Sequence, residues 1–103
     1  MGASRHQLLN EALEMSRRMA SLGGAGDWDA VIDLEPERRN LLEQAFATHV
    51  PADELVADRV RAILDLDKQL MAMSIEARDR IADELGHTNK ARKATSAYQS
   101  ARG

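Results

Sequence analysis

The feature that most constrains the fold is a long apolar pattern in the second half of the chain. Residues 52–85 contain no glycine or proline, and their apolar side chains recur every three to four residues. That spacing is typical of an α-helix that buries one face. At 1.5 Å per residue, this helix would be about 50 Å long. Because 103 residues leave no room for a second core, this one helix dominates the expected fold.

A shorter helix is expected before it, over about residues 4–22. Ser4 is a suitable N-cap, and Gln7 three residues later completes a capping box. The glycine-rich stretch 23–26 follows the apolar pattern and is expected to end the helix as a linker. It follows a helix and lacks a Lys-Ser or Lys-Thr pair, so it does not fit a phosphate-binding loop.

A second helix is expected over about residues 28–48, capped by Asp27. Pro36 lies inside it, where a proline removes a backbone hydrogen bond and crowds the preceding turn. We therefore expect a kink there, or a split into two shorter helices.

The C-terminal residues differ from the rest in charge. Residues 1–87 carry a net charge of −7, whereas residues 88–103 carry four cations and no acid. Gly86 can end the long helix at about residue 85 and leave a short basic helix over about 90–99, although a single glycine costs a helix only about 1 kcal/mol. Both arrangements are open.

These elements predict an all-α, antiparallel three- to four-helix bundle with a long third helix and a basic C-terminal tail helix. One domain is expected over residues 1–103. The third helix is long enough to run beside the first two until about Met73 and then to overhang them. The apolar residues of the overhang would need cover from the tail, a second subunit or another protein.

Composition and motifs exclude several functional classes. The chain has no cysteine, its three histidines are far apart, and its serines lack a nucleophile context, so neither an enzyme nor a metal or cofactor site is expected. No apolar stretch is long enough for a signal peptide or a membrane span, which predicts a cytoplasmic protein. Four cations and one aromatic residue make a weak nucleic-acid footprint, so no nucleic-acid partner is expected.

Charged residues interrupt the apolar faces of the second and third helices. Because a buried charge is costly unless it is paired, we expect a polar layer in which acids and arginines from the two helices meet. The residues of this layer are Glu35, Arg38, Arg39 and Asp67.

The apolar arc of the third helix is wider than one core requires, about 200° instead of roughly 100°. The surplus predicts a binding surface on helices two and three that receives an amphipathic helix. Methionines suit such surfaces, although they also fill gaps in cores. The predicted partner-binding residues are Leu66, Leu70, Met71, Met73, Ile75 and Ile81.

Several short stretches resemble the FliT family of flagellar export chaperones. Their order and spacing extend from about Leu8 to Tyr98. The stretches are GDWDAV over 26–31, LEPERR over 34–39, LL over 41–42, ILDLDKQL over 63–70 and KARKA over 90–94, followed by Tyr98.

The resemblance implies a cytoplasmic chaperone that binds the C-terminal part of the filament-cap protein before export. It also implies docking with the export ATPase complex or the export gate, and in some bacteria antagonism of the flagellar master transcription regulator. The C-terminal helix of such proteins is thought to mask the binding surface, which would give an autoinhibitory role to Lys90, Arg92, Lys93 and Tyr98. A homo-oligomer such as a dimer is expected, and a structural homo-oligomer or an adaptor without an export client is the alternative.

Overall fold

The computed structural model describes residues 4–47, 51 and 53–102, with side chains described except at 88–91 and 94–102. Three helices follow one another along the chain: α1 (Arg5–Gly24), α2 (Trp28–Ala45) and α3 (Glu54–Arg102). The described residues contain no strand, so the predicted all-α class is confirmed. Contacts divide the chain within α3, with one compact unit up to Met73 and a second from Ser74. The sequence predicts that the two units form one domain, and this stays a prediction.

α1 begins and ends on signals that are visible in the sequence. The Ser4 hydroxyl accepts a hydrogen bond from the Gln7 backbone N–H, and the Gln7 side chain accepts one from the Ser4 backbone N–H. This is the expected capping box. The helix nevertheless continues to Gly24, two residues beyond the expected end. The turn falls at Gly26, whose φ of 81° is a conformation that glycine adopts at little cost.

Gly23 belongs to the packed interior and not to a linker. A Cβ at this position would lie 2.9 Å from Leu70 Cδ1 and 3.1 Å from a ring carbon of Trp28. The absence of a side chain therefore lets α1, α2 and α3 approach one another closely at this end of the unit.

α2 is one helix, and the expected split at Pro36 does not occur. Asp27 caps the helix by accepting a hydrogen bond from the Ala30 backbone N–H at 3.3 Å. A proline has no N–H, so the carbonyl of Ile32 receives no hydrogen bond from residue 36. Packing on α1 outweighs the loss of that single bond. Residue 48, the expected end of the helix, lies outside the described residues.

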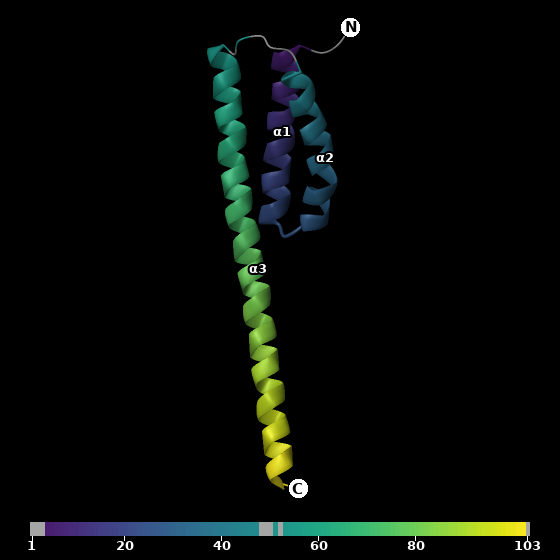
Figure 1. Cartoon of the computed structure of the whole chain (residues 1–103), viewed down its shortest axis with the longest axis vertical. Helices are drawn as coiled ribbons and strands as arrows, with labels where there is room; N and C mark the ends of the chain where they lie inside the picture. Colours follow the sequence, from purple (N-terminus) through teal and green to yellow (C-terminus); the bar gives the residue numbers. More distant parts are fainter. Residues whose placement is uncertain (1–3, 48–50, 52, 103) are drawn as a thin grey trace. The chain divides into compact units, whose positions relative to one another are not determined.

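The core of the first unit lies where the three helices meet. α1 contributes Leu8, Leu9, Ala12 and Leu13, α2 contributes Ala45, and α3 contributes Val56 and Ile63. α1 and α2 run antiparallel (Figure 1). The first part of α3 runs parallel to α1, because Arg59 contacts Asn10 near the start of both helices and Leu70 lies beside Gly23 near the end of α1.

α3 continues through Gly86 to Arg102, so of the two arrangements that the sequence left open the structure has the continuous helix, without a separate helix over 90–99. Glycine is tolerated here because the described residues on both sides are good helix formers, such as Leu85 and Arg92. No turn interrupts the helix that would let the tail fold back over Ile81 and Leu85.

Candidate docking face

Five large apolar side chains are exposed among the described residues of the first unit, and four of them lie on α2, at its C-cap and on α3 beyond its first turns, whereas Leu55 lies at the start of α3. Ile32 and Met71 are each more than 60% exposed, and Phe46 and Leu64 are about half exposed. We call these four residues the docking face. Each lies in the first compact unit, whose core is already filled by other side chains.

Helical spacing places the four residues on one side of the unit. Ile32 on α2 and Phe46 at its C-cap belong to a row of residues that recur every three or four positions, and Glu35 and Arg39 lie between them. On α3, Leu64 and Met71 lie three residues before and four residues after Asp67. Because Asp67 contacts Arg38 of α2, Leu64 and Met71 lie on the side of α3 that is turned toward α2.

Charged residues cross the middle of the docking face. Arg39 Nη2 donates to Glu35 Oε2 at 2.6 Å along α2, and Arg38 Nη1 donates to Asp67 Oδ1 across the two helices. We call Glu35, Arg38, Arg39 and Asp67 the polar band. The structure brings the residues of the predicted polar layer together as two separate ion pairs.

Arg38 connects all three helices. Its side chain is only 12% exposed, and it donates to the buried hydroxyl of Ser16 on α1 at 3.2 Å. Ser16 in turn donates to the carbonyl of Ala12 at 2.8 Å. The sequence did not indicate a role for Ser16, since a serine inside an apolar helical pattern has no signature of its contacts.

The predicted partner-binding residues fall into two groups. Leu66 packs against the core, Leu70 lies against Gly23, and the sulfur of Met73 lies 3.8 Å from the place of a Cβ on Gly24. These three side chains are half-buried, and their part in binding a partner stays a prediction. Met71, Ile75 and Ile81 are exposed, the last two in the unit that begins at Ser74.

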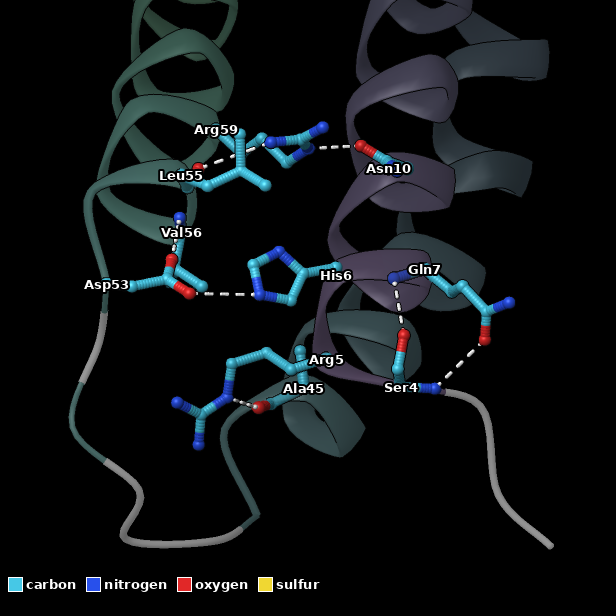
Figure 2. A network of polar contacts seen from close by, with 10 residues as sticks. All are labelled: Ser4, Arg5, His6, Gln7, Asn10, Ala45, Asp53, Leu55, Val56 and Arg59. Atoms are coloured by element: carbon cyan, nitrogen blue, oxygen red, sulfur yellow. Dashed lines mark hydrogen bonds and ion pairs between the residues drawn. The ribbon is translucent and has the colours of Figure 1, made fainter.

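A second polar cluster holds the N-terminus of α3 to α1 (Figure 2). Asp53 caps α3 by accepting from the Val56 backbone N–H at 2.8 Å, and its other carboxylate oxygen lies 3.1 Å from His6 Nε2. The Val56 hydrogen bond and, to a smaller extent, the nearby His6 hold the pKa of Asp53 below its usual value. The sequence did not indicate this contact of His6, because nothing local links it to a residue 47 positions away.

The same end of the unit also joins α1 to the other helices. Arg5 Nε donates to the carbonyl of Ala45 at 2.9 Å, and the Arg5 guanidinium lies 6.0 Å from the centre of the Phe46 ring. Arg59 donates to Asn10 (Figure 2). These contacts satisfy carbonyl groups and fix helix positions, as structural polar clusters do.

The described part of the chain contains no group of three histidine, aspartate or glutamate side chains able to hold a metal ion. None of the described helices combines the length and apolarity needed to cross a membrane. Of the predicted tail residues, Arg92 and Lys93 are exposed, whereas the side chains of Lys90 and Tyr98 lie outside the described ones.

Fold and face together define a small all-α protein with a helical hairpin, a long third helix and an exposed apolar face. The profile of the family described as flagellar protein FliT matches residues 6–100. The chain therefore belongs to the FliT family of flagellar proteins.

A relative from Yersinia enterocolitica (serotype O:8, biotype 1B), described as flagellar protein FliT, is 29% identical over 104 residues. The similarity covers 91% of this chain and 87% of the relative. No solved structure matches the chain.

Proposed function

We propose that this protein is a cytoplasmic flagellar export chaperone that holds the C-terminal region of the filament-cap protein on the docking face. Family membership supports a role in the flagellum. The expected client segment is an amphipathic helix, because such helices lay an apolar face into apolar grooves between helices.

The observation that carries the proposal is the exposure of four large apolar side chains on one side of a packed unit. Large apolar side chains that gather on one side of a protein, with polar residues around them, mark interaction sites. Ile32 and Met71 are the most exposed of the four, at 65% and 63%.

Delivery of the client completes the proposed activity. The protein would carry the cap protein to the export ATPase complex or the export gate, and would antagonise the flagellar transcription regulator in bacteria that use this control. These partners come from the family resemblance. No catalysis is part of the proposal.

Met71→Asp tests the proposal with the C-terminal segment of the cap protein as ligand in isothermal titration calorimetry. A carboxylate in the docking face should weaken binding at least tenfold, while the circular dichroism spectrum keeps its helical shape. Leu55→Asp is a matched control, since Leu55 is 47% exposed near the start of α3 and outside the docking face. Equal affinities for both variants and the wild type would remove the docking face from the proposal.

The basic tail is proposed to regulate binding by covering apolar residues that the client would contact in addition to the docking face, such as Ile81 and Leu85. Because α3 is continuous, this cover requires the helix to open near Gly86. Deleting residues 88–103 should tighten client binding by a few-fold to tenfold, because the closed fraction of molecules lowers apparent affinity. Gly86→Ala should have a smaller effect in the same direction. Unchanged affinity in the deletion variant would argue against a mask.

A structural homo-oligomer without a client is the second candidate. It is favoured by the exposure of Ile81 and Leu85, each nearly 60% exposed on the second unit. Sedimentation of the purified chain with and without the cap-protein segment separates the two functions. An oligomer that ignores the segment supports the second candidate, whereas a complex with the segment supports the chaperone.

A further inference from the structure

The docking face is divided in two by the polar band. Glu35 and Arg39 are one helical turn apart on α2, and Asp67 lies beside them on α3 through its contact with Arg38. The side chains of Glu35 and Asp67 are 36% and 38% exposed, and that of Arg39 is 63% exposed. All three therefore still contact water in the free protein.

The contact between Arg38 and Asp67 also shows which apolar residues of α2 and α3 lie at the same height along the two helices. Because α2 and the first part of α3 run antiparallel, Ile32 and Met71 lie on one side of the polar band. Phe46 and Leu64 lie on the other side. At 1.5 Å per residue, the two apolar patches are about 10 Å apart along α3 and about 20 Å apart along α2.

The polar band thus presents two ion pairs without net charge at the middle of the docking face. A ligand helix with a continuous apolar face would displace water from the charged side chains of the polar band. It would offer them no hydrogen-bonding groups in place of that water. Desolvating an ion pair without new hydrogen bonds opposes binding. A glutamine side chain both donates and accepts, so it can replace the lost water at a neutral pair. Apolar contacts above and below the polar band would be unchanged.

We propose that the polar band is a specificity filter. It selects an amphipathic helix whose apolar face is interrupted at its centre by uncharged hydrogen-bonding side chains such as glutamine, and it rejects a helix with an unbroken apolar face. Discrimination by an unfavourable contact with the wrong partner is a general route to specificity. The inference rests on the proposed function, because it assumes that the docking face receives a helix.

Two synthetic helical peptides of about 18 residues test the filter against the full-length chain. Both peptides carry leucines near the two ends of one face, and the two central positions of that face are glutamine in one and leucine in the other. Calorimetry should show the glutamine peptide binding about tenfold more tightly to the wild type. In the variant Glu35→Leu/Arg39→Leu the preference for glutamine should fall several-fold, because only the Arg38–Asp67 pair is left to desolvate.

The matched control is Glu14→Leu/Arg17→Leu, which removes an exposed ion pair of the same kind from α1. This control should keep the preference for glutamine. Ile32→Asp should weaken the binding of both peptides, which would place them on the docking face. Leucine is a good helix former, so the exposed substitutions should preserve the circular dichroism spectrum.

The outcomes separate the two proposals. Equal binding of both peptides to the wild type, with Ile32→Asp weakening both, would overturn the filter and leave the docking face intact. Failure of both peptides to bind the wild type would overturn the docking face as a helix receptor, and the filter with it.

Discussion

The backbone of α3 is helical in both of its parts, but different interactions stabilise the helix in the two parts. Between Glu54 and Met73, Val56 and Ile63 are buried in the core, and Asp53 and Asp67 hold the helix to its neighbours. Beyond Met73, none of the side chains that the structure describes is buried. Tertiary packing supports the first part, whereas the second depends on helix propensity and local contacts, which alone give marginal stability in water.

Two isoleucines on α3 give the largest expected contrast. Ile63 is 4% exposed, so Ile63→Ala should lower the free energy of unfolding by about 2–4 kcal/mol through lost burial and the cavity left behind. Ile81 is 58% exposed, so Ile81→Ala should change it by less than about 0.5 kcal/mol. Urea unfolding followed by circular dichroism measures both. Similar losses would show that the second part is packed as firmly as the first.

Asp67→Ala should lower the free energy of unfolding by about 1–2 kcal/mol, because it leaves the mostly buried guanidinium of Arg38 without its carboxylate. Exposure of the Asp67 side chain keeps the value below that of a fully buried pair. Asp58→Ala, which breaks an exposed pair with Arg61 on the same helix, should have little effect. Thermal unfolding of the wild type and the two variants measures both effects. Indistinguishable melting temperatures would show that the Arg38–Asp67 pair does not stabilise the fold.

Two glycines should respond in opposite directions. Gly23→Ala forces a Cβ toward Leu70 and Trp28, and should lower the free energy of unfolding by about 1 kcal/mol. Gly86→Ala meets no atom within 4 Å and should stabilise the helix there by about 0.5–1 kcal/mol. Melting temperature measures the first effect and ellipticity at elevated temperature the second. A loss of ellipticity in Gly86→Ala would indicate that this glycine has another role.

The smallest expected effect is a change in stability at low pH. The carboxylate of Asp53 is favoured in the folded protein because its pKa is lowered, chiefly by the Val56 N–H. Its contribution to stability is therefore complete above its ordinary pKa, near 3.8, and is lost as the pH falls through the lower folded value. Asp53→Asn keeps a capping side chain but cannot titrate. The difference in melting temperature between the wild type and this variant should be constant from about pH 5 to 7 and shrink below about pH 3.8. A constant difference down to pH 2.5 would contradict this assignment.

Local signals in the sequence predicted much of the first unit. The Ser4–Gln7 capping box, the Asp27 cap and the helical spacing of apolar residues each depend on neighbours within four positions. The all-α class follows from the same signals. Whether the helices continue through Pro36 and Gly86 was harder to predict. The answer depends on whether the rest of each helix is stable enough to compensate for one lost hydrogen bond at Pro36 or for one flexible residue at Gly86.

The docking face was only partly predictable. The wide apolar arc of α3 indicated a surplus of apolar residues, but not which edge of the arc faces the core. In the structure Leu70 lies against Gly23, and Leu66, Leu70 and Met73 are half-buried, whereas Met71 is exposed. Pairs such as His6 with Asp53 are separated by too many residues for any local pattern to join them.

The contacts of Arg38 lead to a hypothesis about the order of events in folding. Its partners Ser16 and Asp67 are 22 and 29 residues away, so the second contact closes a longer loop and requires α3 to have docked on the α1–α2 hairpin. If the hairpin forms first, Asp67→Ala should accelerate unfolding and leave the refolding rate nearly unchanged. Stopped-flow rates across a range of urea concentrations would show this, and a slower refolding limb would instead put α3 in the nucleus. If the hairpin forms first, the contact of the Asp67 carboxylate with Arg38 forms late in folding. The strength of this contact then determines the unfolding rate, and with it the lifetime of the folded protein.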